Sequence, residues 1–191
     1  MPQRLILAST SPYRRELLAR LRLTFEVSSP GVDEHYLDGE APALRAERLA
    51  LAKARAVAAH HPDAIVIGSD QVATLGDDIL DKPGSYDNAF AQLRRASGQR
   101  ITFNTGVAVI DANSASVRVV PYYAEFRALT DREIDAYLNL EQPYDCAGAA
   151  KVESLGIALL ARMEGSDPTA LIGLPLIATA ELLRQRGLLV P

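Results

Sequence analysis

The sequence predicts an α/β fold in one domain, or in two lobes that share a sheet. Short apolar segments that suit strands alternate along the chain with segments whose apolar residues recur at helical spacing. The chain has 191 residues, of which 48% are hydrophobic and 23% are charged, so it can bury a sizeable core. We find no internal repeat, low-complexity tract or flexible linker in the sequence, which favours a compact arrangement of these elements.

In the first half of the chain, strands and helices are expected to alternate. The expected elements are a strand at 4–9, a helix at 13–22, a strand at 25–28, a helix at 42–60, a strand at 64–69 and a strand near 72–75. The run Ile65-Val66-Ile67 is apolar on both faces, which is typical of a central strand. Gly76, Asp77 and Asp78 suit the turn of a hairpin after the strand near 72–75.

The second half is expected to contain a long strand pair and three helices. The expected elements are a helix at 85–97, antiparallel strands at 101–110 and 116–127, a helix at 130–140, a strand at 156–161, a turn at 165–168 and a helix from about 175 to 186. Ser85 suits the N-cap of the first of these helices and Gly98 its end. Thr130 and Glu133 have the spacing of a capping box.

Composition narrows the functional classes. The net charge of −4 argues against binding to nucleic-acid polymers, although a local basic cluster can still hold a small anionic ligand. No apolar stretch is long enough to span a bilayer and no targeting segment is evident, so we expect a cytoplasmic protein that does not bind membranes. Cys146 is the single cysteine, which excludes an internal disulfide and a cysteine-cluster metal site; we expect a buried structural thiol.

The segment Ser9-Thr10-Ser11-Pro12-Tyr13-Arg14-Arg15 has the features of an anion site. It joins a short strand to a helix, with Thr10 or Ser11 as the N-cap and Pro12 in the first turn. Backbone N–H groups, hydroxyls and guanidinium groups would then converge where a phosphate can accept hydrogen bonds. The alternative is an ordinary strand-to-helix turn with solvated arginines.

Two acidic positions are candidates for catalysis or metal binding. Asp70 follows the predicted strand at 64–69, where ligands gather in α/β proteins, and Glu34 lies in a loop after the strand at 25–28. Together with the basic residues Arg14, Arg15, Lys53 and Lys82, they would suit a hard divalent cation and a phosphate ligand. Alternatively, Asp70 caps the next turn and Glu34 is a solvated surface residue.

Nine motifs, in order along nearly the whole chain, resemble those of the Maf nucleotide pyrophosphatases. They are Ser9-Thr10-Ser11-Pro12-Tyr13-Arg14-Arg15, Val32-Asp33-Glu34, Arg48-Leu49-Ala50-Leu51-Ala52-Lys53-Ala54, Gly68-Ser69-Asp70, Lys82-Pro83, Ser97-Gly98, Thr105-Gly106, Ala147-Gly148 and Gly173-Leu174-Pro175-Leu176. The resemblance implies a single domain, residues 1–191, with a two-lobed mixed sheet, flanking helices and a nucleotide cleft between the lobes, similar to inosine triphosphate pyrophosphatases. It also implies metal-dependent cleavage of a nucleoside triphosphate to the monophosphate and diphosphate.

The resemblance also implies roles for individual residues. Ser9, Arg14, Arg15, Lys53 and Lys82 would hold phosphates, and Lys82 would be catalytic together with Asp70. Glu34 and Asp70 would hold Mg²⁺ or Mn²⁺, with Co²⁺ as a further candidate. Asp70 would also activate the attacking water. Cations are needed there because a triphosphate repels an incoming hydroxide. The family resemblance further favours a homodimer.

Three positions, Tyr13, Gln71 and Glu153, are expected to determine which base is bound. The residues around Tyr13, Gln71, Cys146 and Glu153 depart from the thymidine and uridine triphosphate branch of the family and resemble the 7-methyl-GTP branch. Glu153 could accept two hydrogen bonds from the cationic 7-methylguanine, and Tyr13 could stack on it. Alternatively, Tyr13 packs on the first helix and Glu153 is a solvated loop residue.

Two other functions stay open. The chain could be a Maf enzyme that prefers dTTP or UTP, or a non-catalytic nucleotide-binding regulator of cell division. The presence of Asp70, Glu34 and Lys82 argues against a pure binding protein, which would not need a set of residues that activates water. A panel of nucleoside triphosphates would separate these hypotheses.

Overall fold

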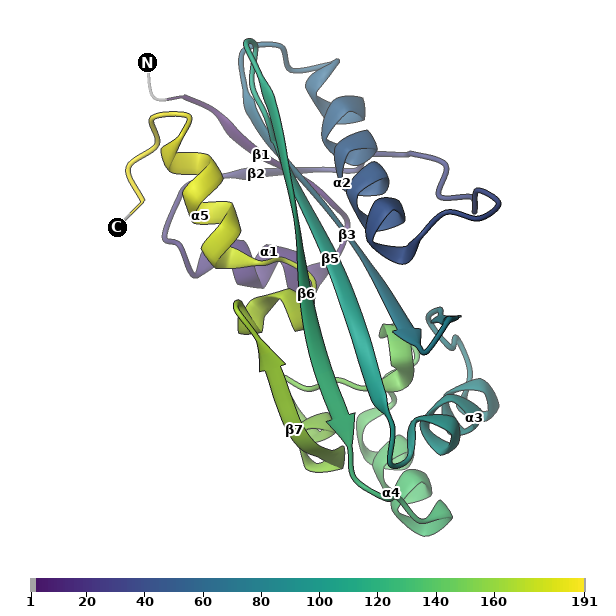
Figure 1. Cartoon of the computed structure of the whole chain (residues 1–191). Coiled ribbons are helices and arrows are strands. Elements are labelled where there is room, and N and C mark those ends of the chain that lie inside the picture. The colour runs from purple at the N-terminus through teal and green to yellow at the C-terminus, as the bar shows by residue number, and fades with distance from the viewer. Residues whose placement is uncertain (1–2, 191) are drawn as a thin grey trace.

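The computed structural model describes residues 3–190, which fold around one seven-stranded sheet (Figure 1). The strands are β1 (Leu5–Ala8), β2 (Glu26–Ser28), β3 (Ile65–Leu75), β4 (Asp78–Leu80), β5 (Arg100–Ile110), β6 (Ala115–Phe126) and β7 (Leu160–Gly165). The α-helices are α1 (Pro12–Ala19), α2 (Pro42–Ala58), α3 (Tyr86–Ala96), α4 (Asp131–Glu141) and α5 (Leu176–Arg184). Short 3₁₀ helices cover Ala147–Ala149, Leu155–Leu159 and Pro168–Ile172.

The sheet is mixed, with the order β2-β1-β3-β5-β6-β7 and with β4 paired to β3. Strand β1 is parallel to β2 and β3, whereas the other pairs are antiparallel. In Figure 1, α1, α2 and α5 lie around one end of the long strands β3, β5 and β6, and α3 and α4 lie around the other end. The α/β class and the mixed sheet with flanking helices are therefore as the sequence predicts.

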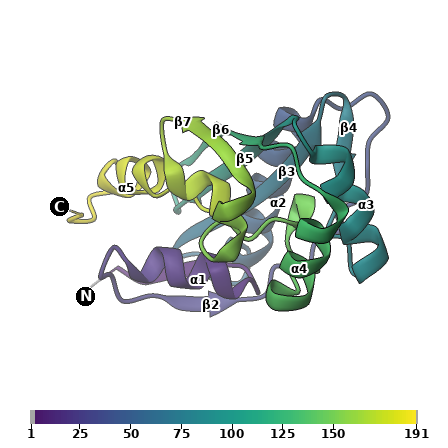
Figure 2. The ribbon, with the colours of Figure 1, turned by 90° about the horizontal axis from the view of Figure 1, so that it is seen from below.

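Helices cover both faces of the sheet near β1 (Figure 2). Leu5 and Leu7 of β1 belong to the core that includes Leu17 of α1 and Leu182 of α5, whereas Ile6 of β1 packs in a second cluster with α2. Successive strand residues point to opposite faces, so a strand covered on both sides needs an unbroken apolar run. The four residues of β1 are all buried.

Helix α2 approaches the sheet closely because two glycines lie beneath it. A Cβ at Gly68 of β3 would lie 2.3 Å from the backbone oxygen of Ala50, and one at Gly106 of β5 would lie 2.4 Å from that of Ala46. Neither backbone atom could move away without shifting the helix. The glycines therefore allow the short distance between α2 and the two long strands, β3 and β5.

The expected break between strands at 64–69 and 72–75 is wrong, because β3 is one continuous strand of 11 residues. Its partner β1 ends where Ala8 pairs with Gly68, while β5 goes on pairing with β3 as far as Leu75. Asp70 consequently lies in the middle of β3, just beyond the end of β1. The polar run at residues 69–71 resembles the end of a strand. It is not one, because these residues stay paired with β5 after the pairing with β1 has ended.

The expected strand at 156–161 is also wrong over most of its length. Leu155–Leu159 is a 3₁₀ helix, and the edge strand β7 begins only at Leu160. The chain curls back here, since the N–H of Gly156 donates to Lys151 O at 2.9 Å and the N–H of Leu155 donates to Glu141 at 3.0 Å. The other expected elements are present with ends shifted by at most three residues, and both the Ser85 N-cap and the Thr130–Glu133 capping box are confirmed.

Among residues 3–190, no helix is both long and apolar enough to cross a membrane.

Candidate active site

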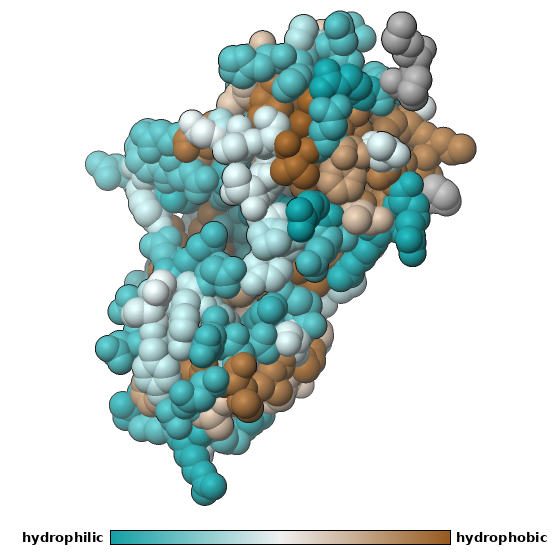
Figure 3. Space-filling model, turned by 180° about the vertical axis from the view of Figure 1, so that it is seen from behind, coloured by the Kyte–Doolittle hydropathy of each residue, from teal (hydrophilic) through white to brown (hydrophobic). Residues whose placement is uncertain are grey.

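One large cavity, of about 520 Å³, is lined by residues from both ends of the sheet. In Figure 3 the surface is hollowed between the part of the molecule that contains α2 and the part that contains α3. Nine of the ten candidate site residues line this cavity: Ser9, Tyr13, Arg14, Glu34, Lys53, Asp70, Gln71, Lys82 and Glu153. Arg15 does not; it is exposed on α1 and lies outside the cavity wall. Its proposed contact with phosphate therefore has no support in the geometry.

The partly buried guanidinium group of Arg14 and two backbone N–H groups capped by serine hydroxyls lie where β1 passes into α1. Ser11 is the N-cap, and its Oγ accepts from the N–H of Arg14 at 3.3 Å, while Ser9 Oγ accepts from the N–H of Ser11 at 3.1 Å. Arg14 is oriented by a hydrogen bond of 2.9 Å from Nε to Gly173 O. Burial lowers the pKa of Arg14, while Asp70 and Glu34 act in the opposite direction. The N–H groups of Ser11 and Arg14 are engaged by serine hydroxyls, so the guanidinium group of Arg14 is what this corner offers to an anion.

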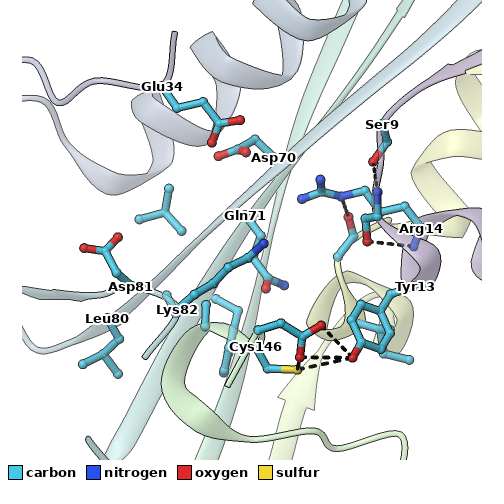
Figure 4. Close-up of a pocket in the computed structure, with 18 of the residues that line it drawn as sticks. Ser9, Tyr13, Arg14, Glu34, Asp70, Gln71, Leu80, Asp81, Lys82 and Cys146 are labelled. Atoms are coloured by element: carbon cyan, nitrogen blue, oxygen red, sulfur yellow. Dashed lines mark hydrogen bonds between the residues drawn. The ribbon is translucent and has the colours of Figure 1, made fainter. Parts of the chain in front are cut away.

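Lys53 lies between the two candidate metal ligands. Its Nζ is 2.6 Å from Asp70 Oδ1 and 2.7 Å from Glu34 Oε1. Lys53 and Asp70 are each only 6% exposed, whereas Glu34 reaches in from the exposed loop between β2 and α2. Figure 4 shows the Glu34 and Asp70 carboxylates side by side at one end of the cavity. The close approach of α2 over Gly68 places the lysine there.

The two carboxylates fit a divalent cation only with help from a ligand. Among residues 3–190 no group of three or more His, Cys, Asp or Glu side chains is arranged to hold a metal ion. Mg²⁺ usually takes one or two protein carboxylates together with water and substrate phosphates. Glu34 and Asp70 can supply the protein's share, so the donor set fits Mg²⁺ or Mn²⁺ bound with a polyphosphate.

Gln71 is held by the opposite wall. Its Nε2 donates to Ala170 O at 2.8 Å and to Leu171 O at 3.0 Å, and it lies 3.1 Å from Thr105 Oγ1. Its amide nitrogen is thus engaged by the chain itself, and its position is fixed by the 3₁₀ helix at Pro168–Ile172. Lys82, by contrast, is exposed at the rim of the cavity, in the segment between β4 and α3.

Figure 4 shows Tyr13 and Cys146 across Gln71 from Glu34 and Asp70. Asp145 and Glu153 also line the cavity and lie near them. The Tyr13 hydroxyl donates to Asp145, with Oδ2 at 3.1 Å and Oδ1 at 3.3 Å. Lys151 Nζ lies 5.6 Å from the centre of the Tyr13 ring and 3.4 Å from Glu141 Oε1. Within residues 3–190 no basic side chain lies within 4.0 Å of the Asp145 or Glu153 carboxylate. The balance of charge at this end is therefore acidic.

Burial raises the pKa values of two groups at this end of the cavity, Glu153 and Cys146. Burial raises the pKa of Glu153 above its ordinary value, and the negative charges of Glu141 and Asp145 add to the shift. Burial also raises the pKa of Cys146 to about 12, with Asp145 adding to the effect. Cys146 is half-buried in the cavity wall, so the expectation of a buried structural thiol is corrected. Its thiol is a poor nucleophile.

Sequence reasoning missed four polar residues that line the cavity: Tyr36, Arg45, Asp81 and Asp145. Asp81 directly precedes the Lys82-Pro83 motif, and Asp145 lies two residues before the Ala147-Gly148 motif. Their closeness to these motifs could have pointed to them. Arg45 lies two helical turns before Lys53, on the same face of α2, so helical spacing could have found it. Tyr36 gives no such signal, because nothing in the sequence predicts the path of the loop at 29–41.

Comparison with known proteins gives the family. The family model described as "Maf-like protein" matches residues 4–186. A 7-methyl-GTP pyrophosphatase of Thiobacillus denitrificans is 57% identical over 96% of this chain and 92% of its own length. One of a Polaromonas species is 58% identical over 96% of this chain and 84% of its own length.

Among solved structures, a dITP/XTP pyrophosphatase of Mycobacterium abscessus matches 73% of this chain and 96% of its own, with 18% identity and a TM-score of 0.41. The family model matches nearly all of the chain, and the two relatives are 57% and 58% identical to it over 96% of its length. These matches show the family. The chain belongs to the Maf family.

Proposed function

We propose that the chain hydrolyses 7-methyl-GTP to 7-methyl-GMP and diphosphate. The observation that carries this proposal is the cavity itself. It holds Lys53 with two carboxylates at one end, and an aromatic ring at the other, beside two carboxylates with no basic side chain of residues 3–190 within 4.0 Å. Relatives that are 57–58% identical are named 7-methyl-GTP pyrophosphatase, which supports the same substrate.

The acidic end suits a cationic base. 7-Methylguanine bears a positive charge and presents two donors, N1–H and the N2 amine, to which the Glu153 carboxylate can offer two acceptor oxygens. Uracil and thymine would present carbonyl oxygens to the same carboxylate, which is repulsive. Tyr13 can stack on the cationic ring, although Lys151 already lies over one face of the Tyr13 ring, so the base would use the other.

The other end suits the polyphosphate. Arg14 and the serine hydroxyls of Ser9 and Ser11 line one side, Lys53 lies between Glu34 and Asp70, and Lys82 is at the rim. A divalent cation held by Glu34 and Asp70 would neutralise phosphate charge when it is bound. Phosphate oxygens would then take over the position near Lys53 and release it from its two carboxylate partners.

Hydrolysis requires an in-line attack by water. We assign Asp70 to orient the water and accept its proton, because it is the buried carboxylate of the site. The water oxygen forms a bond to the α-phosphorus, the bond from that phosphorus to the bridging oxygen breaks, and diphosphate leaves. Lys53 and Lys82 stabilise the negative charge that develops on the phosphoryl oxygens.

The test is a panel of purified nucleoside triphosphates with Mg²⁺, Mn²⁺ or Co²⁺, in which the nucleotide products are separated by chromatography. The proposal expects 7-methyl-GMP and diphosphate, with turnover lost in excess chelator and restored by Mg²⁺ or Mn²⁺. Formation of 7-methyl-GDP and phosphate, or full turnover in chelator, would contradict it. Faster cleavage of dTTP or UTP would assign the chain to the other branch, and binding without turnover would indicate a regulator. The homodimer and the cytoplasmic location stay predictions.

A further inference from the structure

Arg45, near the start of α2, is buried in the cavity wall and only partly satisfied. It is 8% exposed, and its Nη2 donates to the backbone oxygen of Glu34 at 2.8 Å. Its guanidinium carbon lies 3.4 Å from the centre of the Tyr36 ring, in the geometry of a cation–π contact. Its Nη1 is buried without a hydrogen-bond partner among residues 3–190.

A buried donor without a partner is destabilising, so fold stability alone is a weak reason for an arginine at this position. Both contacts that Arg45 does make go to the loop at 29–41, one to Glu34 and one to Tyr36. The arginine therefore fixes the part of the loop that presents the Glu34 carboxylate to Lys53. Figure 4 shows Glu34 and Asp81 on the same side of the cavity.

Tyr36 connects this loop to the segment that contains Lys82. Its hydroxyl donates to Asp81 Oδ1 at 2.5 Å, and Asp81 precedes Lys82 directly. A continuous set of contacts thus runs from the Glu34 backbone through Arg45 and Tyr36 to the residue before Lys82.

We propose that Arg45 and Tyr36 are positioning residues of the polyphosphate end. Arg45 holds the Glu34 backbone in place, and the hydrogen bond from Tyr36 to Asp81 holds Lys82 at the rim, so that the two loops act together. This inference rests on the function proposed above. Because these residues face the polyphosphate and not the base, their loss lowers kcat by the same factor for every nucleoside triphosphate that the enzyme cleaves.

The test compares Tyr36→Phe with a matched control, Tyr86→Phe. Tyr86 of α3 makes the same kind of bond, from its hydroxyl to Asp135 Oδ1 at 2.7 Å, but it lies outside the cavity wall. Each substitution removes one tyrosine–aspartate hydrogen bond. Tyr36→Phe is expected to lower kcat by about threefold to tenfold with less than a twofold change in KM, whereas Tyr86→Phe leaves both unchanged.

A double-variant cycle separates positioning from general loosening. Asp81→Ala should lower kcat about as much as Tyr36→Phe, and the double variant should lower it no further, because both changes break one contact. Arg45→Lys keeps the charge but not the planar group that stacks and donates, so it should also lower kcat. Thermal unfolding of each variant is measured alongside.

The inference is overturned if Tyr36→Phe changes kcat no more than Tyr86→Phe, if the two losses multiply in the double variant, or if the loss depends on the base. An unmodified enzyme that cleaves none of the nucleotides would instead overturn the proposed function. An enzyme active on a different nucleotide would still allow this test, with that nucleotide as the substrate.

Discussion

Replacing Asp70 by Asn tests the chemistry with the smallest change of shape. An asparagine can still offer an oxygen to Lys53 Nζ, which lies 2.6 Å from Asp70 Oδ1, but it can neither accept a proton from water nor hold a divalent cation by its charge. We expect kcat to fall by about a hundredfold or more, which corresponds to about 2.7 kcal/mol of lost transition-state stabilisation.

The effect on stability should be much smaller. Removing one partner of a buried ion pair costs about 3–5 kcal/mol when it leaves the other charge alone. Lys53, however, keeps Glu34 Oε1 at 2.7 Å, and a buried carboxylate no longer has to be desolvated. We therefore expect a loss of about 1–2 kcal/mol, which for a chain of this size lowers the melting temperature by about 2–8 °C.

The assay is steady-state release of diphosphate at a temperature well below the melting transition, with the fold checked by circular dichroism. The matched control is Asp78→Asn, an exposed aspartate that pairs with Arg95 outside the cavity wall and should leave kcat unchanged. If Asp70→Asn retains more than about a tenth of the normal kcat while folded, Asp70 is neither the base nor an essential ligand.

Three further predictions follow from other parts of the structure. Glu153→Gln should lower kcat/KM for 7-methyl-GTP by about one to two powers of ten and leave that for UTP or dTTP equal or higher; equal losses on all three would place Glu153 at the polyphosphate end. Gly68→Ala should lower the free energy of unfolding, measured with urea, by about 1–3 kcal/mol, and should also lower activity. The added Cβ would lie 2.3 Å from Ala50 O and force α2 away from the sheet; an unchanged free energy of unfolding would refute this. Hydrogen bonds from Thr130 lower the pKa of Glu133 to about 2, so its stabilisation is present above about pH 4.5 and is lost as the pH falls toward 2. Glu133→Gln should therefore be more damaging at pH 7 than at pH 3 in urea unfolding, and an equal effect at both would count against it.

Much of the fold follows from local patterns. The apolar run at Ile65-Val66-Ile67 and the capping box at Thr130 depend on neighbours in the sequence, and the structure confirms both. The 3₁₀ helix at Leu155–Leu159 depends instead on Glu141, which is distant in the sequence and accepts from the N–H of Leu155. Contacts of that kind are invisible to periodicity, and that region was assigned wrongly.

The candidate site also contains some residues that the sequence could identify and others that only the three-dimensional structure shows. Residues in recognisable motifs, such as Arg14, Lys53 and Asp70, could be found in advance, and they line one cavity. The adjacent Arg15 could not be separated from Arg14 by sequence, because only the direction of each side chain on α1 decides that Arg14 reaches Gly173 and Arg15 faces solvent. The contact of Tyr36 with Asp81 joins two loops whose paths no local pattern specifies.

The most direct test of the proposed activity is a competition. Equimolar 7-methyl-GTP, GTP, UTP and dTTP are incubated together with the enzyme and Mg²⁺, and their disappearance is followed in one reaction, so that the relative rates give the ratios of kcat/KM. We expect 7-methyl-GTP to be consumed first and to yield 7-methyl-GMP, with GTP far behind because its base is uncharged. Earlier consumption of UTP or dTTP, or equal consumption of GTP and 7-methyl-GTP, would contradict it.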